Sequence, residues 1–241
     1  MVAILSFYAA HPRAEAAVMM AQGVDLIVAS TAPGGTAPGT ALGTTGTGTQ
    51  NNNNTQIRTG QWDGGAGSIF ATVYSFQLPN LGLISNPFSS AAFSSNLNAI
   101  NNPVGVDYGV DLYGLPSRMT SAISASDYYA GDTPDPAATL LQDSFLTTAS
   151  PTGQNASSDI ASYLNAQYAG GANAGDWVFI RMNIDGDTVI DDVRGGYLTA
   201  SFEADTALQP FIMYDLVAVP EPSRAVLLSL ACFGMLLRRR R

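Results

Sequence analysis

The sequence predicts a mainly β fold, an antiparallel β-sandwich with one short helix in its body and a hydrophobic helix at the C-terminus. Two observations lead to this class. Short apolar runs rich in β-branched and aromatic residues recur along the chain, separated by Gly, Pro, Asn and Asp. Helical periodicity in the body is confined to one segment, so the alternating helices of a parallel α/β sheet are not predicted. The length of 241 residues suits a single domain.

The expected elements follow from this pattern. Strands are predicted at 24–29, 69–76, 106–113, 177–184, 188–193, 197–202 and 211–217. The body helix is predicted at 157–169, where Ile160, Leu164 and Tyr168 recur every four residues before two glycines. We expect Ile160 and Leu164 to be buried against a sheet, and Trp177 to belong to the core.

Composition excludes several kinds of chemistry. The chain has no Lys, and its single His and single Cys, His11 and Cys232, lie in end segments that we expect to be removed. The remaining body then lacks the imidazole, thiol or amine that catalytic triads, Schiff bases and P-loops require. We therefore expect no catalytic residues, no enzyme activity and no cofactor.

Charge excludes another class of partner. Between residues 17 and 219, four arginines stand against seventeen acidic residues. A body this acidic is repelled by phosphate backbones, so nucleic-acid binding is not expected.

The C-terminal segment 219–241 has three parts. Val219, Pro220, Glu221 and Pro222 precede an apolar stretch at 225–237, and the chain then ends in Arg238, Arg239, Arg240 and Arg241. A helix of thirteen residues is about 20 Å long and short for a permanent span. The terminal arginines favour a cytoplasmic C-terminus, with the body across the membrane. A buried core helix is the alternative, although four arginines directly after it argue against burial.

This segment resembles the PEP-CTERM sorting signal, in which Pro-Glu-Pro is followed by a hydrophobic stretch and an Arg-rich end. Pro220, Glu221 and Pro222 match the motif, and the four terminal arginines match its basic stop. The resemblance implies an exosortase as partner, transient association with the inner membrane, and export to the cell surface or extracellular matrix.

Residues 1–16 are predicted to form an atypical or truncated signal peptide. Residues 2–10 are apolar, and Ala14-Glu15-Ala16 satisfies the cleavage rule, but nothing basic precedes Val2. The alternative is a first buried strand. The domain then spans 17–218, with a low-complexity loop at 31–54 that is rich in Gly, Thr and Asn.

Six further runs in the body form a recognisable set: QIRTGQWDGGAG at 56–67, DLYGLPSR at 111–118, SASDYYAG at 124–131, DPAATLLQDSFLT at 135–147, YLNAQYAGGANAGDWVFIRM at 163–182 and PFIMYDL at 210–216. Through these runs the body resembles DNRLRE-type domains. The resemblance implies a jelly-roll-like sandwich related to carbohydrate-binding modules, with exopolysaccharide as a partner.

Three aromatic residues are the candidate glycan contacts. Trp62 and the pair Tyr128-Tyr129 lie among Gly and Asp, a context that favours exposure. Sugar rings stack on exposed aromatic faces. Single exposed aromatics are also common on protein surfaces, so the alternative is no binding role.

A dense acidic cluster offers a weak calcium candidate in Asp185, Asp187 and Asp191. The spacing approaches that of a calcium loop, but the glycine comes one residue early. The Asp-Gly pair is equally typical of a hairpin turn. We favour the turn and predict no metal site.

The function predicted from these observations is an exported, exosortase-processed surface or matrix protein with a structural or glycan-binding role. The alternative is a secreted polysaccharide hydrolase that uses a pair of carboxylates. Asp111, Asp176 and Glu203 are its candidates, because each adjoins an apolar strand.

Overall fold

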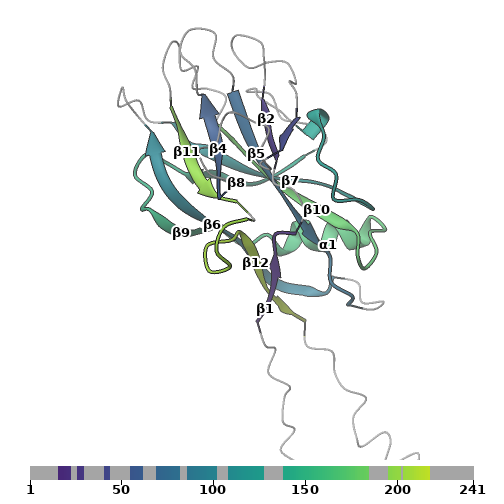
Figure 1. The fold of residues 1–241 in the computed structure, drawn as a ribbon. Helices are drawn as coiled ribbons and strands as arrows, with labels where there is room; N and C mark the ends of the chain where they lie inside the picture. The colour runs from purple at the N-terminus through teal and green to yellow at the C-terminus, as the bar shows by residue number, and fades with distance from the viewer. Residues whose placement is uncertain are drawn as a thin grey trace, which may run out of the picture.

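The fold is mainly β and antiparallel, as predicted, and its described strands form one continuous sheet that curls into a half-barrel. In the computed structural model, the residues described are 16–22, 26–29, 41–43, 55–61, 69–81, 86–101, 108–127, 138–184, 195–201 and 203–217. They form the strands β1 (Ala17–Met20), β2 (Leu26–Ala29), β3 (Ala41–Gly43), β4 (Gln56–Gln61), β5 (Ile69–Gln77), β6 (Phe88–Asn101), β7 (Val110–Arg118), β8 (Thr139–Leu146), β9 (Gly153–Ala156), β10 (Trp177–Ile184), β11 (Gly195–Ala200) and β12 (Phe211–Leu216) (Figure 1). The one α-helix of this part of the chain is α1 (Ala161–Ala169), and η1 (Ala125–Asp127) is a single 3-10 turn.

All pairings between the strands are antiparallel, and the main path runs β1-β12-β6-β11-β4-β5-β10-β7-β8. The path curls so that its two halves face each other. Phe93 on β6 contacts Phe76 on β5 and Phe145 on β8, and neither strand is a hydrogen-bonded neighbour of β6. The main hydrophobic core fills the space between the two halves.

Most predicted strands are confirmed within a few residues. The prediction for 177–184 matches β10 at both ends, and β2, β5, β11 and β12 overlap the predictions for their regions. The prediction at 106–113 is wrong at its start, because β7 begins at Val110 and continues to Arg118. Pro116 lies where the β7–β10 register shifts, a position at which a strand tolerates proline. The predicted strand 188–193 lies outside the described residues.

The fourteen-residue strand β6 was not predicted, because its sequence FSSAAFSSNLNAIN is rich in Ser and Asn. It pairs with β12 and then β11 along one edge, and with β9 along the other. Beyond β9, side chains from 157–165 bond to that second edge. The Oγ of Ser157, Oδ1 of Asp159 and Oδ1 of Asn165 accept hydrogen bonds from the backbone N–H groups of Phe93, Ala91 and Phe88. Long-range pairing therefore makes this polar segment a strand.

The helix α1 is shorter than predicted at its N-terminus. Instead of opening the helix, the residues at 157–160 donate backbone hydrogen bonds to β6, from Ser157 to Phe93 O and from Ile160 to Ala91 O. Ile160 and Leu164 are buried, as predicted. Tyr168 is half-buried against the main core.

A second, smaller apolar cluster lies on the outer face of β5, β10 and β7. It contains Ala71, Val73, Leu115, Ile123 and Phe179. Trp177 was predicted to belong to the core, but it is only partly buried, at the margin of this outer cluster.

Two further predictions concern the loop and the ends. Within the predicted loop 31–54, residues 41–43 instead form β3, which pairs with β2 and so extends the sheet. No helix in the described part of the chain is both long and apolar enough to cross a membrane. Residues 1–15 and the predicted segment 225–237 lie outside that part.

Candidate functional site

The residues proposed from the sequence for glycan, calcium and sorting roles lie outside the described ranges. They are Trp62, Tyr128, Tyr129, Asp185, Asp187, Asp191, Val219, Pro220, Glu221, Pro222, Arg238, Arg239, Arg240 and Arg241. The structure does place the strands that lead to several of them.

Several strands end together at one end of the curled sheet, which we call the loop end. At this end Gly195 of β11 pairs with Gln61 of β4, and Gly196 of β11 pairs with Asn101 of β6. Ile184 of β10 pairs there with Val110 of β7. The strands preceding Trp62 and Asp185 therefore both end at the loop end (Figure 1).

The last strand ends at the opposite end of the molecule. Leu216 of β12 pairs with Phe88, the first residue of β6, whereas Asn101 at the other end of β6 lies at the loop end. Strands rise about 3.3 Å per residue, so the two ends of β6 are about 40 Å apart. The chain beyond β12 thus starts far from the loop end.

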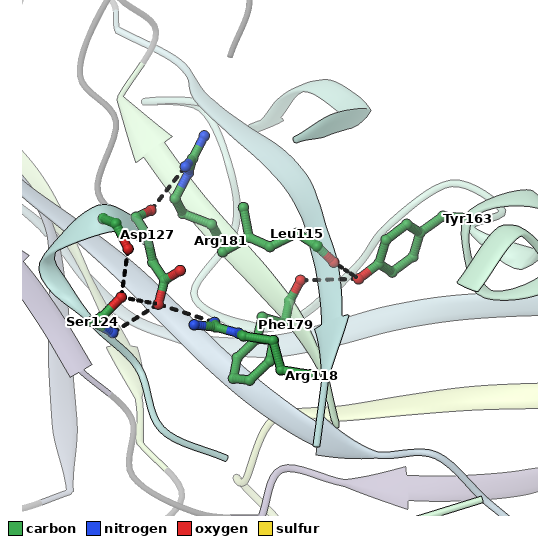
Figure 2. A network of polar contacts seen from close by, with 8 residues as sticks. Leu115, Arg118, Ser124, Asp127, Tyr163, Phe179 and Arg181 are labelled. Atoms are coloured by element: carbon green, nitrogen blue, oxygen red, sulfur yellow. Dashed lines mark hydrogen bonds and ion pairs between the residues drawn. The ribbon is translucent and has the colours of Figure 1, made fainter. Parts of the chain in front are cut away.

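A buried arginine marks the outer face of β5, β10 and β7. Arg181 lies on β10 between Val73 and Tyr113 and has no exposed surface. Its Nη1 donates a hydrogen bond of 2.8 Å to the backbone oxygen of Asp127, and its guanidinium lies 5.1 Å from the centre of the Tyr113 ring (Figure 2 shows the bond to Asp127). Burying a charge is costly unless polar groups compensate it. The backbone oxygen of Asp127 and the ring of Tyr113 provide such compensation for Arg181.

A second arginine holds the same aspartate by its side chain. Nη2 of Arg118 lies 3.0 Å from Oδ2 of Asp127, and the guanidinium of Arg118 stacks over Phe179 at 3.8 Å from the ring centre. The backbone N–H of Ser124 also donates to Oδ2, at 2.8 Å. Arg118, Asp127 and Arg181, which we call the arginine clamp, thus fix the end of η1 onto the sheet (Figure 2).

Strands β7 and β10, which carry Arg118 and Arg181, are also fixed from the core side. The hydroxyl of Tyr163 on α1 donates to the backbone oxygens of Leu115 at 2.6 Å and Phe179 at 3.2 Å (Figure 2). Burial raises the pKa of Tyr163, so the hydroxyl stays protonated as a donor. The ring lies against Gly114, where a Cβ would be 2.4 Å from Tyr163 Cε2. A glycine is needed here because of this close approach.

The clamp fixes the point from which the chain leads to two of the three predicted glycan contacts. Asp127 directly precedes Tyr128 and Tyr129 in the sequence. Both its carbonyl and its carboxylate are held, so the chain enters the tyrosine pair from a fixed point. Sequence reasoning missed the clamp, although one charged residue inside the apolar run WVFIRMNI was a usable signal.

Polar residues also lie where β7 and β10 approach the loop end. Asp111 and Asn183 are opposite each other and both buried. Asp111 Oδ1 accepts a 2.9 Å hydrogen bond from the N–H of Ser144. Among the described residues, no group of three His, Cys, Asp or Glu side chains could hold a metal ion. The calcium candidates two to eight residues beyond Asn183 remain a prediction.

Two of the carboxylates considered for hydrolysis, Asp111 and Asp176, lie far apart. Asp111 lies beside Asn183, whereas Asp176 immediately precedes the other end of β10. Seven residues of extended chain separate these positions, about 23 Å, against the roughly 5–9.5 Å between the carboxyl groups of a glycosidase. Asp176 instead closes a turn, accepting a hydrogen bond from the N–H of Asn173 at 2.7 Å. Glu203 lies in the turn between β11 and β12.

Comparison with protein-family models and with curated proteins found no match for this chain. The functional interpretation therefore depends on the sequence motifs and on the placement of the strands.

Proposed function

We propose that this protein is an exported, exosortase-processed component of the cell surface or extracellular matrix, with a jelly-roll-like body that is structural or binds glycans. The observation that carries the proposal is the C-terminal segment. Pro220-Glu221-Pro222, the apolar stretch 225–237 and the four terminal arginines stand in the order of a PEP-CTERM signal. A tail of this kind would direct the protein to the cell surface or matrix, and the structural or glycan-binding role would belong to the body.

The arrangement of the body supports a sorted surface protein. β12 ends about 40 Å from the loop end, as estimated from the rise along β6. A domain attached through its C-terminus would thus project the loop end away from the point of attachment. The strands before Trp62 and Asp185 end there, so this end is the natural place for a ligand.

Glycan binding is the more specific form of the proposal. Aromatic rings provide stacking surfaces for sugars, and Trp62, Tyr128 and Tyr129 are the proposed ones. The arginine clamp fixes Asp127 next to the tyrosine pair. Fixing a contact before binding lowers the entropy lost on association, so the clamp supports a binding role. The separation of Asp111 and Asp176 gives hydrolysis less support.

Sorting is tested by intact-mass measurement after expression of the full chain with and without an exosortase. We expect the enzyme to remove the terminal arginines, and Glu221→Ala with Pro222→Ala to prevent removal. Pro151→Ala is the matched control, because Pro151 is exposed and lies in a loop. A mature protein that still carries Arg238 to Arg241 in the presence of exosortase would contradict the proposal.

Glycan binding is tested with the exopolysaccharide of the producing organism, with and without calcium. We expect binding to weaken in Trp62→Ala and in Tyr128→Ala with Tyr129→Ala. Leu140→Ala, at an exposed apolar position on β8, should bind normally. Release of reducing ends that is lost in Asp111→Asn with Asp176→Asn and Glu203→Gln, with folding intact, would favour the hydrolase instead. Absence of any binding would leave a purely structural role.

A further inference from the structure

The outer face of β1, β12 and the adjacent part of β6 is apolar. Cross-strand pairs place Val18 beside Met213 and Met20 beside Phe211, and Ala92 lies on the other side of Met213. These five residues form what we call the terminal-strand patch. Their neighbours Met19, Ile212 and Tyr214 point to the opposite side and are buried. The patch therefore faces away from the core.

The patch is exposed at its centre. Val18 is 51% and Met213 is 49% exposed, and Val217 just beyond β12 is 45% exposed. The patch itself contains no charged residue, and at its margin Asp215 Oδ2 accepts a 2.8 Å hydrogen bond from Ser90 Oγ. Exposed apolar side chains that are contiguous and uncharged mark a contact surface rather than ordinary scatter.

The patch lies where the proposed membrane tail leaves the domain. β1 begins and β12 ends at the same end of the molecule (Figure 1). Seven residues separate Val217 from Ala225, the first residue of the apolar stretch. Even fully extended, the chain from Val217 to Ala225 spans at most about 28 Å. A bilayer that holds 225–237 is thus within reach of the patch.

We propose that the terminal-strand patch rests on the surface of a lipid bilayer while the C-terminal segment is inserted. This inference depends on the membrane insertion of the tail proposed above. Five side chains make a weak site alone, but a short tether raises the effective concentration to the order of millimolar. Because the patch is uncharged and the body strongly acidic, the contact is with the apolar–headgroup boundary of zwitterionic lipid rather than with anionic headgroups.

The test uses the full chain reconstituted in phosphatidylcholine vesicles. Cys232 is the only cysteine, so Cys232→Ser allows one fluorescent label at a chosen position. Labels are placed at Met213→Cys and, as the matched control, at Leu140→Cys, which is 53% exposed on β8 at the far end of the strand path. We expect severalfold stronger quenching by brominated lipid at position 213 than at 140.

A charge variant checks that the patch itself makes the contact. With the label at Val217→Cys, Val18→Asp with Met213→Asp should reduce quenching severalfold, whereas Leu140→Asp should leave it unchanged. Vesicle flotation reports tail insertion separately. Flotation with equal quenching at 213 and 140 would overturn the patch proposal alone. Failure to float would instead contradict the membrane tail, and crosslinking between labels at position 213 with no lipid quenching would identify a second copy as the occupant.

Discussion

The outer face of the sheet on β5, β10 and β7 differs from the outer face on β1 and β12. Both reverse the usual pattern, in which charged residues are exposed and apolar residues are buried. On β5, β10 and β7 the outer face carries Arg181, which is fully buried. On β1 and β12 the outer face carries Val18 and Met213, which are about half exposed. The segment that ends in η1 packs onto the first face through Asp127. Burial on these faces therefore depends on the covering segment and not on the strand residue.

The difference between the faces also separates two kinds of role. Arg181 is held by a backbone oxygen and an aromatic ring, so it stabilises the position of η1. The terminal-strand patch faces away from the core, and Val18 and Met213 at its centre are about half exposed. Substitutions on the first face should change stability, and substitutions on the second should change interactions.

The largest effect is expected from removing the buried arginine. Arg181→Ala should lower the free energy of unfolding by about 3–4 kcal/mol, because it leaves a cavity and unsatisfied polar groups beneath η1. Arg181→Met should recover part of this loss, because it restores apolar volume. Urea denaturation followed by tryptophan fluorescence measures both. A loss below about 1 kcal/mol for Arg181→Ala would mean that the clamp does not hold η1.

The next largest effect is expected at Gly114, where the ring of Tyr163 packs against β7 from the core side. Gly114→Ala should destabilise by about 2–3 kcal/mol, because its Cβ would meet the buried ring of Tyr163. Gly109→Ala is the matched control on the approach to the same strand, since its Cβ would meet mainly the small side chain of Ser144. Thermal unfolding of the two variants compares them. Equal melting temperatures would contradict the tight packing of Tyr163 on β7.

An alkaline transition is expected from the buried tyrosines. Burial raises the pKa of Tyr108 and Tyr168 to about 12 and also raises that of Tyr163. The contribution of these tyrosines to the free energy of unfolding is fully present below the unfolded-state pKa of about 10. It falls as the pH rises toward the folded-state pKa, by up to about 1.4 kcal/mol per pH unit for each tyrosine. Denaturation at pH 9 and pH 11 measures the loss. Tyr163→Phe should reduce it, and an unchanged slope in that variant would contradict the assignment.

The smallest effect on stability is expected on the apolar face. Val18→Lys or Met213→Lys should change the free energy of unfolding by less than about 0.5 kcal/mol, because both positions are exposed. Ile212→Lys provides the contrast, since Ile212 directly precedes the exposed Met213 on β12 and is buried. The same urea titration applies. A large loss for Met213→Lys would show that the patch is part of the fold.

The sequence could predict elements whose signal is local. The run at 177–184 was predicted with both boundaries, because nearly all of its residues are apolar and both of its faces are covered. β6 could not be predicted, because its backbone N–H groups complete their hydrogen bonding with the side-chain oxygens of the distant residues Asp159 and Asn165. The clamp likewise joins Arg181 to a residue 54 positions away. Charge in an apolar strand signals a partner, but it does not reveal which one.

The pairing of β1 with β12 also constrains the order in which the chain can be made and moved. It joins Ala17 to Tyr214, which are near the two ends of the described part of the chain, so this pairing cannot form until residue 214 has been made. Ala17 is also the residue that follows the predicted signal cleavage, and the apolar tail begins at Ala225, eight residues after Val217. In the proposed export route, the final strand therefore emerges only just before the tail enters the bilayer. On that proposed route, the β1–β12 pairing would form only when translocation is nearly complete.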